Sequence, residues 1–226
     1  MDALLSDIKI NVNESLYLID PTSSKLGQKI ITESVLMIEA MGFEKFTFKK
    51  LGAKIESPEA SIYRYFKNKY QLLNYLVSMY WGWMEYALVL QTSNIPSPHT
   101  RLERAIELIT SEIEEQFTLE GISIHKLHHL VISESVKSYM TKEVEKANKE
   151  GAYLKYKQFV SRITEIIMEI NPTYKYPHML LTTIIEGAHL QSYFAEHLPR
   201  LTNKQESNDY IQDFYTHLAL QTIKNN

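Results

Sequence analysis

The sequence contains no cysteine among its 226 residues. Disulfide bonds and thiolate metal sites are therefore excluded, and the composition fits a reducing compartment. No apolar run reaches the ~18 residues of a membrane-spanning helix. The N-terminus also lacks the basic region and hydrophobic stretch of a signal peptide. We therefore expect a cytoplasmic protein.

Glycine and proline are also scarce, with seven of each. Long segments show helical periodicity, and no paired alternating strands accompany them. The 44% of hydrophobic residues is enough to bury a substantial core. The sequence thus predicts an all-α protein of about nine helices, with an N-terminal three-helix unit and a C-terminal helical bundle.

The common catalytic motifs are missing as well. There is no G-x-S-x-G, no Walker-type glycine loop and no G-x-G-x-x-G after a strand. His125 and His129 have the i, i+4 spacing of some zinc helices, but no H-E-x-x-H arrangement contains them. Surface or pocket-lining histidines are the favoured interpretation. We expect no enzymatic activity, no cofactor and no metal.

Positive charge gathers in one stretch of this acidic chain. The whole chain has a net charge of -3, whereas residues 45 to 69 carry seven lysine or arginine side chains against Glu56 and Glu59, a net +5. The basic residues are Lys45, Lys49, Lys50, Lys54, Arg64, Lys67 and Lys69. A local basic face in an acidic protein favours a polyanion, and phosphate neutralisation supplies much of the affinity of nucleic-acid binders.

Two short apolar patterns lie in the same stretch. The first is Phe48, Leu51 and Ile55, and the second is Ile62 and Phe66 at a step of four. Between them Ser57 is expected to be the N-cap of a new helix, with Pro58 at its first position. Residues 47–66 therefore predict a helix, a tight turn and a second helix.

A second helix that buries Ile62 and Phe66 turns a different set of side chains outward, at ~100° per residue. These are Ala60, Ser61, Tyr63 and Arg64, with Tyr65 at the margin. Two residues before this second helix do not suit the local structure expected for them. Gly52 weakens a helix by about 1 kcal/mol relative to alanine, and Glu56 lacks the freedom of glycine at positive φ.

The run TFKK, the core EASIYRYFKNK and the following LLNYLV resemble the DNA-binding domain of TetR-family transcriptional regulators. The resemblance covers roughly residues 25–84. It implies a ligand-binding and dimerisation domain at 85–226 and a homodimeric repressor that a small-molecule ligand releases from double-stranded operator DNA. One rival hypothesis is a helical small-molecule-binding protein or enzyme whose N-terminal domain no longer binds DNA. The other is a protein-interaction module that uses the basic helix to dock an acidic partner.

The resemblance also assigns site residues. Ala60, Ser61 and Tyr63 are expected to face bases or adjacent sugar-phosphate. Lys49 and Arg64 are expected to reach guanine edges. Thr47, Tyr65 and Lys69 are expected to contact phosphates, and Lys50 is a further expected DNA-binding position.

Helix signals continue on both sides of this region. The first helix is expected from about Ser24 to Met41, with Gly42 as its stop. Asn68 and Gln71 form a candidate capping box for a helix that continues to about Leu90. Further helices are expected at about 99–118, 122–140, 142–171, 177–198 and 206–224.

Residues 1–24 form an N-terminal arm of a different kind. Ile8, Ile10 and Val12 alternate with polar residues, as in a short strand or an extended segment. A tail packed on the body and an arm that reaches a dimer mate or the DNA both remain open.

The last two helices carry wide apolar stripes, which include Leu181, Ile185, Phe214 and Leu218. One bundle core could absorb them all. Alternatively, part of the stripe pairs with its copy across a twofold axis, as the resemblance implies. The 15 tyrosines and the Trp81 and Trp83 pair could line a ligand cavity or fill the bundle.

Overall fold

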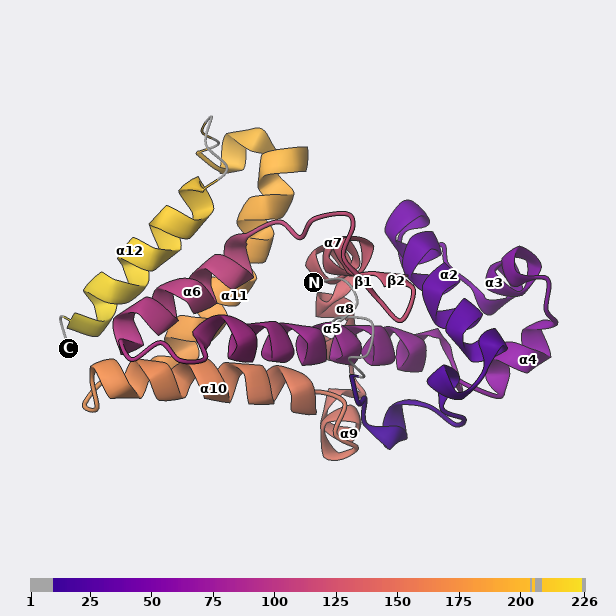
Figure 1. The fold of residues 1–226 in the computed structure, drawn as a ribbon. Helices are drawn as coiled ribbons and strands as arrows, with labels where there is room; N and C mark the ends of the chain where they lie inside the picture. Colours follow the sequence, from indigo (N-terminus) through magenta and orange to yellow (C-terminus); the bar gives the residue numbers. More distant parts are fainter. Residues whose placement is uncertain (1–9, 204, 206–208, 225–226) are drawn as a thin grey trace. The chain divides into compact units, whose positions relative to one another are not determined.

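The protein is almost entirely helical in the computed structural model, which describes residues 10–203, 205 and 209–224 (Figure 1). Eleven α-helices, three short 3-10 helices and one two-stranded sheet make up this described part. The all-α prediction is confirmed, with more and shorter helices than expected. In the described part, no helix combines the length and apolar character needed to cross a membrane.

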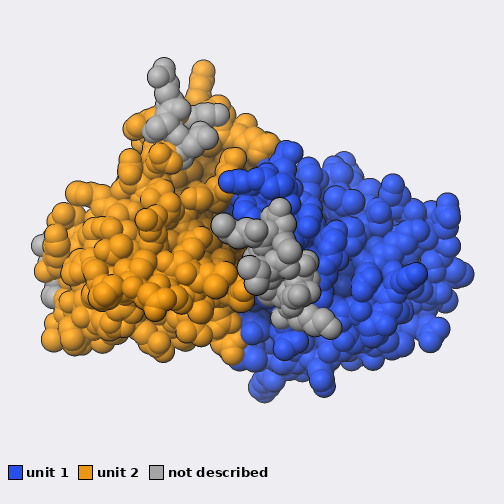
Figure 2. Space-filling view, in the orientation of Figure 1, with its two compact units in different colours: residues 1–82, 113–155 blue, residues 83–112, 156–226 orange. Residues whose placement is uncertain are grey.

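The chain divides into two compact units (Figure 2). Unit 1 comprises residues 1–82 and 113–155, and unit 2 comprises residues 83–112 and 156–226. The two units are defined by how densely their residues contact one another, and not by function. The division of functions near residue 84 stays a prediction.

Unit 1 begins with the 3-10 helices η1 (Glu14–Leu16) and η2 (Pro21–Ser23) and continues with α2 (Lys25–Met41), α3 (Phe48–Ile55) and α4 (Glu59–Tyr63). The first part of α5 (Lys69–Thr92) follows. After unit 2 contributes its first helix, the chain adds β1 (Thr118–Leu119), β2 (Ile122–Ser123), α7 (Ile124–Glu134), α8 (Val136–Tyr139) and α9 (Val144–Lys149).

Unit 2 holds the end of α5, α6 (Pro98–Thr110) and α10 (Leu154–Ile170), whose first residues belong to unit 1. It is completed by α11 (Pro177–His197), the 3-10 helix η3 (Pro199–Leu201) and α12 (Tyr210–Lys224). In this unit α6 contacts both α11 and α12, which also contact each other. Gly187 allows the last contact, because a Cβ there would lie 2.2 Å from the Tyr215 hydroxyl.

Local capping explains why several helices begin where the sequence predicts. Ser24 Oγ accepts the Gly27 N–H at 3.0 Å at the start of α2, and Gly42 ends that helix at φ 77°. Asn68 Oδ1 accepts the Gln71 N–H at 2.9 Å at the start of α5. The reciprocal half of the expected capping box lies one residue earlier, because Gln71 Oε1 accepts the Lys67 N–H at 2.7 Å.

Three expected helices are wrong in extent. The helix predicted at 99–118 ends at Thr110, and the one predicted at 122–140 is broken at Ser135. The helix predicted at 142–171 is interrupted after Lys149, where Gly151 adopts φ 83°. A small hairpin pairs Thr118 with Ser123 and turns through two residues at positive φ, as in a type I′ turn.

The N-terminal segment contains no strand within residues 10–24, which form coil and two 3-10 helices on unit 1. Leu16 is buried, and the Leu18 N–H donates to the Tyr65 carbonyl at 2.7 Å. Ile8 lies outside the described residues. This part of the expected arm packs on its own chain.

Candidate nucleic-acid interface

The core of unit 1 orients α3 and α4. Phe43, Phe46 and Phe66 are fully buried, as are Leu51 on α3 and Ile62 on α4. The helix α3 starts at Thr47, whose hydroxyl accepts the Lys50 N–H at 3.2 Å. A helix, a turn and a second helix therefore occupy residues 47–66 as predicted.

The turn between the two helices depends on Gly52 and Glu56. Glu56 adopts φ 56° and ψ 43°, a left-handed conformation that side chains other than glycine rarely take. This brings the Ser57 N–H to the Gly52 carbonyl at 2.9 Å. A Cβ on residue 52 would lie 2.7 Å from the Ser57 carbonyl oxygen. Glycine at position 52 therefore permits the close approach of the turn.

The start of the second helix differs from the prediction. Pro58, not Ser57, is the N-cap residue, and no side chain caps the helix, which begins at Glu59. The left-handed Glu56 shifts the restart by one residue. The helix is also shorter than expected, because its regular part ends at Tyr63 and Phe66 follows in a turn.

The outward face of α4 matches the sequence prediction. Ile62 is fully buried, whereas Ala60, Tyr63 and Arg64 are exposed and Ser61 is half-buried. Tyr63 keeps 47% of its surface exposed while its ring packs edge-on against Phe48 at 5.1 Å. The arrangement offers a phenol and a guanidinium on a rigid base, which are groups that can contact bases and phosphates.

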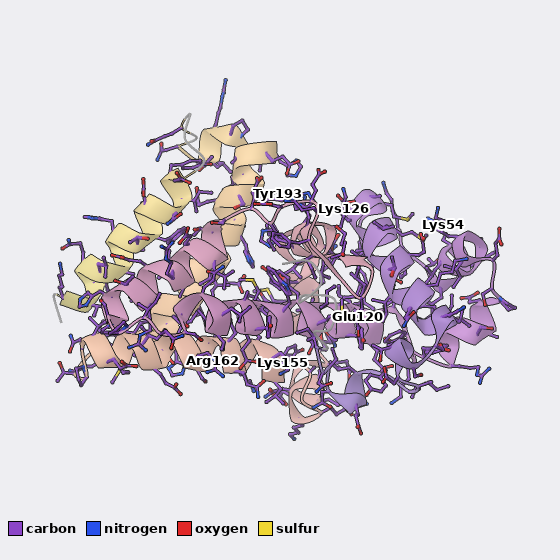
Figure 3. The ribbon with its side chains drawn as sticks, viewed as in Figure 1. Lys54, Glu120, Lys126, Lys155, Arg162 and Tyr193 are labelled. Carbon is purple, nitrogen blue, oxygen red and sulfur yellow. The ribbon has the colours of Figure 1, made fainter. Side chains whose placement is uncertain are left out.

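The basic residues fall into two groups. Four of the lysines are exposed, and their ammonium groups make no hydrogen bond or ion pair with any residue that the structure describes. These are Lys45, Lys49, Lys54 and Lys67; Figure 3 labels Lys54 on α3. Their ammonium groups are available to an outside anion.

Other predicted site residues have partners within the chain. Lys50 Nζ donates to the Lys45 carbonyl at 2.8 Å. Lys69 Nζ donates to the Phe43 carbonyl at 3.0 Å, contacts the Glu44 and Phe46 carbonyl oxygens at 3.4 and 3.5 Å, and lies 4.4 Å from the Phe43 ring centroid. Its ammonium therefore holds the segment between α2 and α3.

Tyr65 is also placed differently from its expected role. Its side chain is 8% exposed, and its hydroxyl lies 2.8 Å from Ser24 Oγ, with either atom able to donate. The phenol thus joins the N-cap of α2 to the turn after α4. This placement does not fit a phosphate contact.

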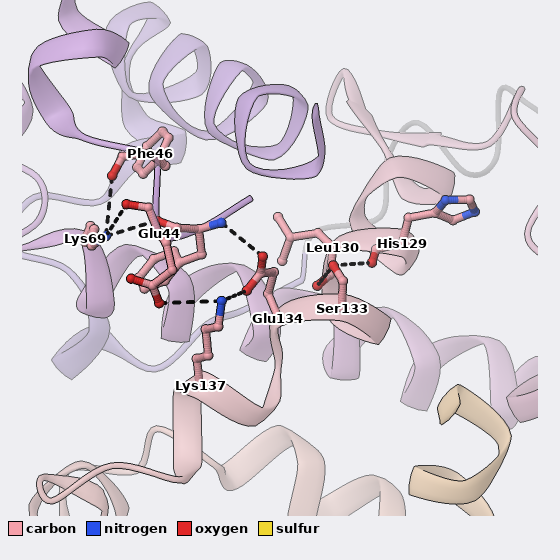
Figure 4. Close-up of polar contacts among 9 residues, drawn as sticks. Glu44, Phe46, Lys69, His129, Leu130, Ser133, Glu134 and Lys137 are labelled. Atoms are coloured by element: carbon pink, nitrogen blue, oxygen red, sulfur yellow. Dashed lines mark hydrogen bonds and ion pairs between the residues drawn. The ribbon is translucent and has the colours of Figure 1, made fainter. Parts of the chain in front are cut away.

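The structure adds Glu134 and Lys137, which the sequence did not single out (Figure 4). Glu134 is 6% exposed, and its Oε1 accepts the Phe43 N–H at 3.0 Å. Lys137 Nζ lies 2.6 Å from Glu134 and 3.5 Å from Glu44. The hydrogen bond to Glu134 is the largest cause that raises the pKa of Lys137 above its ordinary value. The sequence offered one signal for Glu134: it lies on the same helical face as the apolar Leu130 and Val131, where a buried acidic residue needs a partner.

A further lysine supports the turn from the other side. Lys29 Nζ on α2 donates to the Ile55 carbonyl at 3.1 Å, at the C-terminal end of α3. A cation there is favoured by the helix dipole and satisfies a terminal carbonyl. The helix-turn-helix is thus braced by α2, α5 and α7 side chains.

The histidines do not form a metal centre in the described part of the chain. No group of three or more histidine, cysteine, aspartate or glutamate side chains could hold an ion there. The His125 and His129 rings lie 4.4 Å apart, and His125 Nδ1 is 2.7 Å from the Ile113 carbonyl oxygen. His128 is buried, with Nδ1 2.9 Å from the Tyr80 hydroxyl.

Comparison with solved structures finds the same fold. AibR in complex with isovaleryl coenzyme A and operator DNA aligns with a TM-score of 0.60 at 14% identity, over 84% of this chain and 97% of that one. The superantigen PfiT gives 0.59 at 14% identity, over 92% and 100%. The fatty acid degradation regulator FadR from Bacillus halodurans gives 0.58 at 14% identity, over 88% and 98%.

At these identities the structural likeness shows the fold alone. Comparison with curated proteins gives no match. Residues 30–76, which include α3 and α4, match the model of the tetR family of bacterial regulatory proteins. Residues 30–76 therefore form a tetR-family domain in the N-terminal part of the chain.

Proposed function

We propose that this protein is a DNA-binding transcriptional regulator that acts as a homodimeric repressor, and that a small molecule releases it from its operator. The observation that carries the proposal is the outward face of α4. This face is exposed and supported by the buried Ile62, and it lies in the only strongly basic stretch of an acidic sequence.

The exposed groups suit different parts of a DNA duplex. Ala60, Ser61 and Tyr63 face bases or adjacent sugar-phosphate, and Arg64 can bind guanine O6 and N7 through two hydrogen bonds. Lys49 reaches a guanine edge or a phosphate, and Thr47 and Lys50 lie where phosphates pass. Lys69 and Tyr65 are left out of the direct contacts because the Lys69 ammonium contacts three carbonyl oxygens and the Tyr65 hydroxyl is bonded to Ser24. Lys50 is exposed and its ammonium uses only one of its three N–H donors within the described part of the chain.

A dimer would let the short helix α4 recognise a longer DNA sequence, because each subunit contributes one copy. One α4 contacts few bases, whereas two related by a twofold axis read half-sites about 34–36 Å apart, or a multiple of that distance. Exposed apolar side chains on α11 and α12 supply a surface for the partner. They are Met179, Leu190, Tyr193 and Phe214; Figure 3 labels Tyr193.

Release by a ligand requires that the ligand bind the DNA-free form more tightly. A 100-fold loss of DNA affinity corresponds to about 2.7 kcal/mol of coupling, within the usual allosteric range. AibR, which shares this fold, has been solved in complex with both isovaleryl coenzyme A and operator DNA, and this supports a mechanism with two kinds of ligand.

Selection of genomic fragments by the purified protein tests the proposal. We expect a specific subset of fragments to be retained. Arg64→Ala is expected to reduce the discrimination between the selected site and a scrambled site by about 5- to 150-fold, because it removes one bidentate base contact. Lys49→Gln is expected to weaken binding, and to flatten the salt dependence by about one unit of slope if it contacts a phosphate. Lys142→Ala, an exposed lysine outside the family domain, is the matched control.

Two results would contradict the proposal. One is a protein that retains no fragment selectively even at low salt. The other is a control variant at position 142 that loses as much discrimination as the variant at position 64.

A further inference from the structure

A cavity of about 480 Å³ lies within unit 1, apart from the exposed face of α4. Its walls are Glu44, part of η1 with Ser15 and Leu16, the start of α5, and the segment from Lys137 to Glu150. Ala60, Tyr63 and Arg64 do not line it. Sites for small ligands usually measure ~300–1000 Å³, so the cavity has room for an organic molecule.

The charges that line the cavity balance each other. Three are ammonium groups and three are carboxylates: Lys67, Lys137, Lys146, Glu44, Glu143 and Glu150. A ligand of one charge sign meets as many like charges as opposite ones. A molecule that carries both an ammonium and a carboxylate can pair with both kinds, which favours a zwitterion.

The uncharged polar lining matches amide groups. Side-chain amides and hydroxyls dominate it: Ser15, Asn68, Gln71, Asn74, Ser138 and Thr141. These groups both donate and accept hydrogen bonds, as peptide units do.

Apolar surface is also available for an occupant. Tyr70 is 48% exposed and Met140 is 76% exposed, and both line the cavity. An aromatic ring and a flexible thioether can cover side chains of varied shape. Taking the charges, the amide-like lining and the volume together, we propose that the cavity binds a short peptide of two or three residues with free termini.

The cavity is connected to the segment before α3. Glu44 lines it and lies 3.5 Å from Lys137, which also lies 2.6 Å from Glu134 (Figure 4). Glu134 in turn accepts the Phe43 N–H. A charged terminus that pairs with Glu44 or Lys137 competes with these contacts, so occupancy is coupled to the helix-turn-helix. This regulatory consequence rests on the proposed DNA-binding function, whereas peptide binding does not.

A tripeptide library tests the site on the full chain. Purified protein is incubated with randomised tripeptides that have free termini, and in parallel with the same library acetylated and amidated at its ends. Retained peptides are then measured by mass spectrometry. We expect at least 10-fold more retention of the free-ended library, because only free termini pair with both kinds of charge.

Exposed residues of the cavity allow matched variants. Glu143→Gln and Lys146→Gln are expected to reduce retention at least 5-fold. Glu145→Gln and Lys149→Gln lie on the same helix but outside the lining, and are expected to retain peptides like the unaltered protein. The site is overturned if no peptide is retained, if capped peptides are retained equally, or if the two control variants lose retention to the same extent.

The DNA measurement separates this inference from the proposed function. The best-retained tripeptide is expected to change the affinity for the selected DNA at least 5-fold in the unaltered protein and less in the Glu143→Gln variant. Retention of peptides without any selective DNA binding supports the site and overturns the proposed function. Selective DNA binding that the retained peptide leaves unchanged overturns the coupling.

Discussion

At the residue scale, Gly52 and Glu56 show how a tertiary contact reverses a local preference. Alanine would favour the helix at position 52, yet the carbonyl oxygen of Ser57 leaves no room for a Cβ. Glycine would favour the turn at position 56, where Glu56 adopts a left-handed conformation. Glycine therefore occupies the helical position and glutamate the left-handed turn position, the reverse of what the intrinsic preferences of the two residues favour.

This order gives a paired prediction. Gly52→Ala should lower the free energy of unfolding by about 1–3 kcal/mol, the usual cost of overpacking, although alanine is the better helix former. Glu56→Gly should raise it by about 1 kcal/mol, because glycine takes the left-handed conformation without strain. Urea unfolding curves with unchanged slopes measure both. A more stable alanine variant would show that the turn moves to accommodate the Cβ.

At the element scale, the segment between α2 and α3 is held from two sides. Lys69 from α5 donates to its carbonyl groups, and Glu134 from α7 accepts the Phe43 N–H. Both partners are far away in sequence. The position of α3 therefore depends on a helix that lies outside the family domain at residues 30–76.

Removal of Glu134 tests this dependence. Glu134→Ala leaves the buried Phe43 N–H without an acceptor, which should cost about 1–3 kcal/mol of stability and speed hydrogen exchange at that amide. Glu134→Gln keeps an acceptor oxygen and should change the exchange less. Amide exchange resolved by NMR measures the effect. Equal exchange in all three proteins would mean that the bond adds no protection.

At the scale of the whole molecule, the exposed apolar side chains of α11 and α12 form the surface that we propose for a partner subunit. Leu190 and Phe214 are 52% and 59% exposed. The apolar stripes of these helices are therefore divided, because Leu181 and Ile185 are buried within unit 2. A partner subunit would cover the part that the protein's own core leaves open.

Substitution of this surface tests the proposed dimer. Phe214→Glu should halve the mass measured by light scattering, because a desolvated charge opposes association, and should weaken operator binding because one α4 reads few bases. Leu154→Glu, at an exposed apolar position of unit 1 that lies outside the cavity lining, serves as the control. A protein that stays dimeric with glutamate at position 214 would place the interface elsewhere.

Local interactions set the helix boundaries and the outward face of α4, whereas the hairpin depends on a tertiary pairing. Ser24, Thr47 and Asn68 were predictable helix caps because each bonds to an N–H three residues away. The burial of Ile62 and the outward position of Tyr63 followed from the helical period. The hairpin at 118–123 was missed because strands of two residues give no periodic signal.

The sequence by itself determined the all-α class, the basic helix-turn-helix and its outward face, because these follow from the spacing and charge of neighbouring residues. Tertiary structure alone decided which polar groups remain available to a ligand. Lys49 and Lys69 are equivalent as charges, yet only Lys69 meets the carbonyl groups of the 43–46 segment. The same holds for Tyr63 and Tyr65, since burial beside Ser24 uses the second phenol. Such hydrogen-bond partners are far apart in sequence, so the periodicity of neighbouring residues does not predict them.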